Sequence, residues 1–251
     1  MTKLHRTTYH YSRRAFIGAS ASAAFSFSFL PSRVFGANER LQVAGIGVGG
    51  KGKGDFDALA MHGDVVAFCD VNSTRFASLR KHTDAVKFSD YREMLSQFGD
   101  KIDVLNVSTA DHSHAPAAML AMRKGIHVYV QKPMTHTVWE ARQLAKYARE
   151  NKICTQMGNQ GTASDGLREG AEYVRGGGLG KVKEIHAWTN RPVWPQAPGI
   201  VARPSEKQDV PSHMDWNSFI GSAPMRPYHS AYTPFKWRGW WDFGTGALGD
   251  M

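Results

Sequence analysis

Cysteine is scarce in this sequence, and the two present follow no pattern. The 251-residue chain contains only Cys69 and Cys154. A disulfide-built scaffold needs several pairs and a structural zinc site needs ligands at short regular spacings, so neither is the basis of the fold. Each cysteine lies in an apolar run that predicts a buried strand, where cysteine packs as a small hydrophobic residue. We therefore expect both in the core.

Acidic residues are absent from the first 36 positions. Five of the chain's basic residues lie there, so the formal net charge of +9 falls to 9 − 5 = +4 for the rest; they are Lys3, Arg6, Arg13, Arg14 and Arg33. The remaining sequence has no cluster or stripe of lysine and arginine. We therefore expect no nucleic-acid partner.

The sequence also lacks an apolar run long enough to cross a membrane. The stretch "ASASAAFSFSFL" offers about a dozen apolar residues diluted with serine, whereas a span needs about 20. It follows "SRRAFIG", whose paired Arg13 and Arg14 resemble a twin-arginine export signal, and it precedes the small residues of "VFGA". We interpret residues 1–37 as a cleaved leader. The expected location is periplasmic or otherwise extracytoplasmic, with no stable membrane anchor after cleavage.

From residue 41 onward, short apolar runs alternate with helix-like segments. Five runs predict strands buried on both faces: LQVAGIG, DVVAFCDV, IDVLNVS, IHVYV and ICTQM. Predicted helices lie near residues 51–62, 73–82, 90–98, 114–124 and 137–150. This alternation is typical of an α/β fold with a parallel sheet, here a Rossmann domain over residues 38–160. Such sheets bind ligands beyond the carboxyl ends of their strands.

The first strand-end loop, "GIGVGGKG", has the spacing G-x-G-x-x-G at Gly45, Gly47 and Gly50. It follows a predicted strand and opens a predicted helix, and Asp70 closes the next strand 20 residues after Gly50, a context typical of dinucleotide binding. We assign the tight turn to Gly45, the approach to a pyrophosphate to Gly47 and close helix packing to Gly50. Asp70 is placed to accept hydrogen bonds from the adenosine ribose and to repel a 2'-phosphate. NAD is therefore the predicted cofactor, although nearby Arg75 leaves NADP open.

A later strand ends in "NVSTADHSH", which contains the histidine pair His112 and His114. We interpret Asp111 as a helix cap and His114 as facing the cofactor cleft. A metal site is the weakest interpretation, because a third ligand is missing nearby, and no metal is predicted.

The next strand ends in "VYVQKP", which places Lys132 where a nicotinamide is expected. A surface lysine is the simpler interpretation of this residue alone. Together, however, "TADHSH" and "QKP" resemble the T-P-N-x-x-H and E-K-P motifs of the Gfo/Idh/MocA family of oxidoreductases. Gln131 stands where that family has glutamate, and Ala110 where it has proline.

The resemblance covers nearly all of the chain from Leu41 and implies specific functions. It implies hydride transfer between NAD(P) and a hydroxyl of a sugar or cyclitol substrate, and a homo-oligomer. It also implies a second domain with an open, mostly antiparallel sheet. By motif, Lys132 is implied to be catalytic, and Thr109, Asp111, His114 and Gln131 to bind the cofactor.

Residues 161–251 are predicted to begin that second domain, an incomplete α+β unit. Residues 166–176 predict a helix, and "KVKEIHAWTN" alternates like a half-buried strand. Asn159 lies at a strand end, either near the nicotinamide ribose or substrate, or in a simple turn. All tryptophans but Trp139 lie from Trp188 onward. Each ring alone is most simply explained as core or interface, but "WRGWWDFG" as a group suits a sugar, with Trp237 and Trp241 as candidate substrate contacts.

The last residues, "GTGALGD", resemble the family segment G-G-G-x-L-x-D-x-G-x-H. The resemblance implies a catalytic role for Asp250, and the motif's histidine would follow Met251. We therefore expect a C-terminally truncated chain that binds cofactor and turns over poorly. Two rival hypotheses remain: a redox-assisted glycosidase or lyase with no net redox change, and a non-catalytic remnant.

Overall fold

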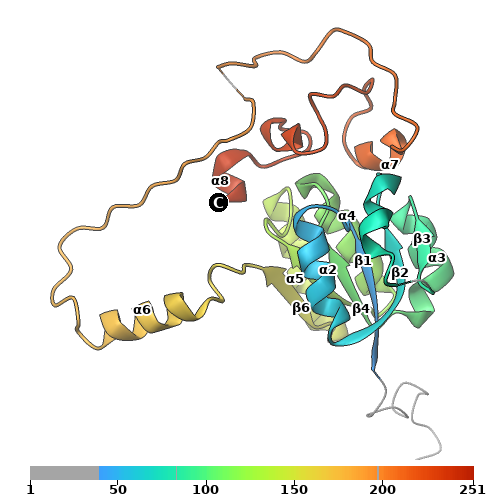
Figure 1. Ribbon diagram of the computed structural model, residues 1–251. Helices are drawn as coiled ribbons and strands as arrows, with labels where there is room; N and C mark the ends of the chain where they lie inside the picture. The colour runs from blue at the N-terminus through green and yellow to red at the C-terminus, as the bar shows by residue number, and fades with distance from the viewer. Residues whose placement is uncertain (1–39, 83, 197) are drawn as a thin grey trace, which may run out of the picture. The chain divides into compact units, whose positions relative to one another are not determined.

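The central sheet of the computed structural model consists of six parallel strands in the order β3-β2-β1-β4-β5-β6 (Figure 1). The structure describes residues 40–82, 84–196 and 198–251, so the predicted leader over residues 1–37 lies outside it. The strands are β1 Leu41–Ile46, β2 Gly63–Cys69, β3 Val86–Phe88, β4 Val104–Val107, β5 His127–Gln131 and β6 Thr155–Gly158. Five correspond to the predicted apolar runs. The strand order reverses between β1 and β4, which confirms the predicted Rossmann arrangement.

Helices connect the strands where the sequence pattern predicts them. They are α2 Lys51–Ala60, η3 Ser73–Leu79, α3 Tyr91–Phe98, η4 Gly99–Lys101, η5 Asp111–Ser113, α4 His114–Arg123 and α5 Val138–Asn151, the η segments being 3₁₀ helices. Helix α5 starts with a capping box between Thr137 and Glu140, and Asp90 caps α3. Helix α2 differs, because its N-cap Gly50 supplies no side-chain cap. The amides of its first turn are therefore left for another acceptor.

Two hydrophobic clusters fill the two faces of the sheet. The larger one joins strand residues such as Ile46 and Leu105 to α3, α4 and α5 through Met94, Met122 and Leu144. The other lies under α2 and η3, and comprises Val48, Phe56, Phe68, Leu79 and Ala85. Burial of these side chains holds the strand ends, and the loops that follow them, in fixed positions.

An aromatic cluster covers the loops at the carboxyl ends of β2 and β4. Its buried members are Ala110, Trp216, Phe219, Ile220, Tyr232, Trp237 and Phe243, and they come mostly from the C-terminal segment after residue 215. This segment includes α7 Trp216–Ile220, η6 Lys236–Gly239 and α8 Gly246–Asp250. Inside the cluster the guanidinium of Arg226 lies 4.8 Å from the centre of the Phe243 ring and is paired with Asp242. Most of these rings thus belong to the core, which agrees with the simplest explanation of each aromatic residue taken by itself.

The connecting segment corrects one prediction. Helix α6 Asp165–Arg175 forms as predicted, although it buries no residue, but residues 181–190 do not form the predicted strand. A strand needs a hydrogen-bonded neighbour, and within the described ranges this segment has none. The only antiparallel pairing there is an isolated bridge between Asn72 and Met214, so the expected antiparallel sheet stays a prediction.

Cys154 is exposed, which corrects its assignment to the core, whereas Cys69 is buried as expected. Cys154 directly precedes β6, which lies at the edge of the sheet and so has a strand on one side only. Among the described residues, no helix combines the length and apolarity needed to cross a bilayer.

Candidate cofactor and active site

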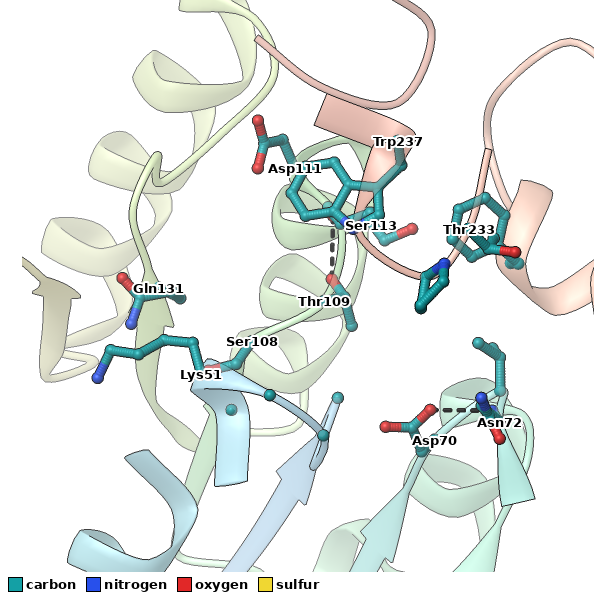
Figure 2. Close-up of a pocket in the computed structure, with 18 of the residues that line it drawn as sticks. Lys51, Asp70, Asn72, Ser108, Thr109, Asp111, Ser113, Gln131, Thr233 and Trp237 are labelled. Atoms are coloured by element: carbon teal, nitrogen blue, oxygen red, sulfur yellow. Dashed lines mark hydrogen bonds between the residues drawn. The ribbon is translucent and has the colours of Figure 1, made fainter. Parts of the chain in front are cut away.

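A cavity of about 550 Å³ lies beyond the carboxyl ends of the central strands. Its lining combines the strand-end loops of the Rossmann sheet with parts of residues 191–251. Figure 2 shows Lys51, Ser108 and Gln131 on one side, Asp70 on another, and Trp237 across from them. The predicted binding edge of the sheet is therefore a real cavity.

Two glycines of the first loop allow close backbone contacts. Gly47 has φ +76°, and a Cβ there would lie 2.5 Å from the carbonyl oxygen of Ser108. A Cβ on Gly52 would lie 1.9 Å from the carbonyl oxygen of Gly47. No other residue fits either position without moving the backbone. The loop, α2 and the end of β4 are thus packed backbone to backbone.

These contacts correct the predicted roles of Gly45 and Gly50. Gly45 lies within β1 and does not line the cavity; a Cβ there would meet the Phe56 ring at 2.5 Å, so it serves packing and not the turn. Gly50 lines the cavity but has no neighbour within 4 Å of a Cβ, so it does not serve packing. The spacing G-x-G-x-x-G also occurs two residues later, at Gly47, Gly49 and Gly52; in that register Gly47 has the positive φ of the turn and Gly52 makes the close backbone contact.

The loop and the start of α2 fit a dinucleotide phosphate. The amides of the first turn of α2 carry the positive end of the helix dipole, and no side chain caps them. Lys51 and Gly52 line the cavity at this point. Gly50, which also lines the cavity, has open space where a Cβ would lie. These residues would hold the pyrophosphate of NAD.

Asp70 lies at the end of β2, as predicted, and lines the cavity. Its carboxylate accepts hydrogen bonds from the backbone amides of Val48 at 3.0 Å and Asn72 at 2.9 Å, which fix its orientation. Burial raises the pKa of Asp70. Free lone pairs remain for ribose hydroxyls. Arg75 also lines the cavity, with its side chain over Gly49.

In the loop after β4, Asp111 lines the cavity but does not cap a helix. Its carboxylate accepts from the amide of Thr245 at 2.9 Å and from the Thr245 hydroxyl at 2.8 Å. Burial raises the pKa of Asp111. The predicted cap is wrong because the carboxylate turns toward the C-terminal segment. Thr109 lines the cavity as expected.

The two histidines of this loop act as structural links. His114 is fully buried and does not line the cavity, which corrects its predicted orientation. Its Nδ1 lies 2.6 Å from the carbonyl oxygen of Pro133, and its Nε2 lies 3.1 Å from that of Thr109. His112 lies between the carbonyl oxygens of Phe219 (2.9 Å) and Phe243 (3.3 Å). Burial lowers the pKa of both histidines. In the described part of the chain, no group of three potential ligands could hold a metal ion.

The two predicted catalytic residues come together at the cavity. Lys132 Nζ donates to the main-chain carbonyl oxygen of Asp250 and lies 3.4 Å from its carboxylate Oδ1. Arg238 Nε lies 3.4 Å from the same carboxylate oxygen. The Arg238 guanidinium is stacked 4.1 Å from the centre of the Trp237 ring. Sequence reasoning missed Arg238, although it lies inside the "WRGWWDFG" group.

Of the remaining predicted residues, Gln131 lines the cavity and Asn159 and Trp241 do not. Asn159 is exposed in the turn after β6, which agrees with the alternative of a simple turn. The side chain of Trp241 is exposed, whereas Trp237 is buried and lines the cavity. Sequence reasoning also missed Asp55, a buried carboxylate behind the cavity. The one feature of the sequence that could have pointed to Asp55 is the position of this aspartate in the predicted helix that follows the glycine loop.

The fold and the cavity are those of an NAD-binding Rossmann domain. A family model described as an oxidoreductase family with NAD-binding Rossmann fold matches residues 41–159, and the model of its C-terminal α/β domain matches residues 199–251. The chain belongs to the Gfo/Idh/MocA family.

Two curated relatives are similar to parts of the chain. A glycosyl hydrolase family 109 protein of Shewanella baltica is 41% identical over 70 residues, 28% of this chain and 15% of the relative. Another, of Saccharopolyspora erythraea, is 31% identical over 149 residues, 53% of this chain and 32% of the relative. The chain thus spans less than a third of these proteins.

Two solved structures share the fold. The myo-inositol 2-dehydrogenase of Lactobacillus plantarum has a TM-score of 0.53 at 22% identity, covering 57% of this chain and 43% of that one. The scyllo-inositol dehydrogenase of Lactobacillus casei, solved with NAD(H) and scyllo-inositol, has a TM-score of 0.51 at 19% identity with the same coverage.

Proposed function

We propose that this protein is an NAD-dependent oxidoreductase that acts on a hydroxyl group of a sugar or cyclitol. The observation that carries the proposal is the contact between Lys132 and Asp250 at the cavity that the glycine loop also lines. It joins the two motifs that sequence analysis selected from opposite ends of the fold. The proposed cofactor is NAD, with Asp70 disfavouring the 2'-phosphate of NADP.

Oxidation of a hydroxyl removes a hydride from carbon and a proton from oxygen. Bound NAD⁺ supplies the hydride acceptor. Lys132 has the hydrogen-bond donors needed to orient a substrate hydroxyl, and the nearby Asp250 carboxylate fixes the lysine and offers a path for the proton. Arg238 contacts the same oxygen of that carboxylate, Oδ1.

The wall formed by Trp237 supports a cyclic polyol as substrate. Its ring offers an apolar face for the C–H groups of a sugar, and the neighbouring Arg238 offers donors for hydroxyls. The named activities of the structural relatives, myo-inositol and scyllo-inositol dehydrogenases, agree with this substrate class.

The test is ligand binding with and without the lysine. Isothermal titration should show NADH binding to the wild-type chain, followed by binding of myo-inositol or glucose to the NADH complex. Lys132→Met should keep NADH affinity within about threefold and lower polyol affinity about tenfold or more, because hydrogen bonds from a charged donor are lost. Lys146→Met is the matched control, since the Lys146 side chain is 64% exposed on α5. Absence of NADH binding by the wild-type chain would refute the proposal.

A redox-assisted glycosidase is the second candidate. It is favoured by the name of the curated relatives, glycosyl hydrolase family 109. In this reaction a transient oxidation would acidify a neighbouring C–H bond, the aglycone would be eliminated, water would add to the double bond left behind, and the hydride would return to the carbonyl carbon, so NAD is unchanged overall. Aglycone release from a nitrophenyl glycoside without accumulation of NADH would favour this candidate.

We also propose export through the twin-arginine pathway and assembly into a homo-oligomer. The paired arginines Arg13 and Arg14 and the apolar stretch after them support export. A reporter fused to residues 1–40 should reach the periplasm, and substitution of both arginines by lysine should stop it. Light scattering of the purified chain tests the oligomeric state.

A further inference from the structure

Asp55 is a buried carboxylate directly behind the cavity. It lies in α2, its residue is 9% exposed, and hydrogen bonds reach it from four residues. Gln131 Nε2 donates at 2.7 Å and Ser108 Oγ at 3.2 Å, both to Oδ2. Gln160 Nε2 donates at 3.2 Å to Oδ1, which Lys51 Nζ also contacts.

The donors come from separate parts of the fold. Lys51 lies one turn earlier on α2, Ser108 follows β4, Gln131 ends β5, and Gln160 follows β6. A carboxylate has about four acceptor positions, so this arrangement uses it fully. Burial of a charge costs free energy, and a packed apolar residue would serve a purely structural role as well or better. The reason for a carboxylate at position 55 is therefore sought in the functions of the residues that donate hydrogen bonds to it.

Three of these partners line the cavity: Lys51, Ser108 and Gln131 (Figure 2). Gln131 also links Asp55 to the lysine of the site, because its Oε1 accepts from the backbone amide of Lys132 at 2.7 Å. The two bonds fix the orientation of the amide, since only its NH₂ group can donate to a carboxylate and only its oxygen can accept from an N–H. Asp55 is thus two hydrogen bonds away from the Lys132 backbone.

The sheet leaves room for this amide. Gly158 of β6 pairs with Gln131, and a Cβ on Gly158 would lie 2.9 Å from both the oxygen and the nitrogen of the Gln131 amide. Any larger residue would displace it. Asp55, the Gln131 amide and the space left by Gly158 therefore lie together at the ends of β5 and β6.

We propose that Asp55 is a positioning residue that aligns Lys51 with the cofactor phosphates and, through Gln131, aligns the Lys132 backbone, which lines the same cavity. This inference rests on the proposed function. It predicts that residues 55 and 131 work as a pair of one carboxylate and one amide, and that their exchange is tolerated better than either single change.

The test is a double-mutant cycle on NADH affinity, measured by titration at a temperature where all variants are folded. Asp55→Asn leaves one oxygen for four donors, and we expect NADH to bind about tenfold more weakly or worse. Gln131→Glu places two carboxylates at hydrogen-bond distance, which disfavours ionisation of both. We expect this variant to have a lowered melting temperature at pH 8 and to recover partly at pH 5, where the pair shares a proton.

The exchange variant, Asp55→Asn with Gln131→Glu, restores the pairing. The amide introduced at position 55 then donates to the carboxylate introduced at position 131, and that carboxylate still accepts from the Lys132 amide. We expect the NADH affinity of the exchange variant to exceed that of both single variants. Asp57→Asn is the control on the same helix, since Asp57 pairs with Lys53 and Lys81 and does not line the cavity.

Three outcomes are decisive. If Asp55→Asn binds NADH like the wild type, or if the exchange variant is no better than the single variants, the inference is wrong. If melting temperatures fall while NADH affinity among folded variants is unchanged, Asp55 has only a structural role. Failure of the wild-type chain to bind NADH would instead overturn the proposed function.

Discussion

Substitution of Gly52 by alanine tests how the cofactor loop is built. A Cβ there would lie 1.9 Å from the carbonyl oxygen of Gly47, whereas ordinary contact begins near 3.4 Å, so the two must separate by 3.4 − 1.9 = 1.5 Å. Neither side can move easily, because Gly47 itself packs against the backbone of Ser108. Overpacking of this kind costs about 1–3 kcal/mol. Alanine regains about 1 kcal/mol from its better helix propensity.

We therefore expect Gly52→Ala to lower the free energy of unfolding by up to about 2 kcal/mol net. The shift of the first turn of α2 should also weaken NADH binding about tenfold, because the helix amides no longer meet the phosphates. Urea denaturation and NADH titration measure the two effects.

Gly54→Ala is the matched control on the same helix. Gly54 is exposed, and a Cβ there would have no neighbour within 4 Å. This variant should gain about 0.5–1 kcal/mol in unfolding free energy and keep its NADH affinity. If both alanine variants behave alike, the backbone contact between α2 and the loop does not exist as described.

Two further predictions concern the C-terminal segment. Asp242→Asn leaves the Arg226 guanidinium, whose side chain is 5% exposed, without its carboxylate, and should cost about 2–4 kcal/mol in urea denaturation; a loss below about 0.5 kcal/mol would contradict the buried pair. Burial lowers the pKa of His112 in the folded protein. As the pH falls below about 6.5, this histidine is therefore protonated in the unfolded chain before it is protonated in the folded one, and the folded protein loses stability. Relative to His112→Gln, the wild type should lose up to about 1.4 kcal/mol per pH unit in that range, and an equal pH dependence of the two proteins would exclude this origin.

The local patterns of the sequence predicted the sheet and the position of the cavity. Apolar runs of strand length and the helix-like segments between them depend on residues close in the chain, and these patterns are strong. Lys132 and Asp250 were selected as catalytic candidates differently, through two short motifs that resemble one family. The structure places these two residues 3.4 Å apart, at Nζ and Oδ1, a contact that the motifs did not predict.

The sequence did not predict contacts between distant backbone groups. The spacing G-x-G-x-x-G occurs in two registers, and the choice between them depends on which carbonyl oxygen faces each glycine. That oxygen belongs to Ser108 for Gly47, far away along the chain. Similarly, Asp55 and Gln131 are 76 residues apart. Neither residue type at either position signals the pairing.

The orientations of polar side chains in the loop after β4 were also beyond the sequence. From residue type, Asp111 was predicted to cap a helix and His114 was predicted to face the cofactor cleft. The structure directs Asp111 to Thr245 and His114 to two carbonyl oxygens, because the C-terminal segment and the Lys132–Pro133 loop pack against the loop from two sides. Such choices depend on tertiary contacts that form only when the segments meet.

Transfer of deuterium tests the central claim most directly. The chain is incubated with NAD⁺ and perdeuterated sugars or cyclitols in slight excess, and the nicotinamide product is analysed by mass spectrometry, which detects even a single slow turnover. We predict reduced cofactor one mass unit heavier than NADH with the wild type, and none with Lys132→Met. Absence of labelled cofactor with every polyol, from a chain that binds NADH, would contradict the assignment as a sugar or cyclitol oxidoreductase.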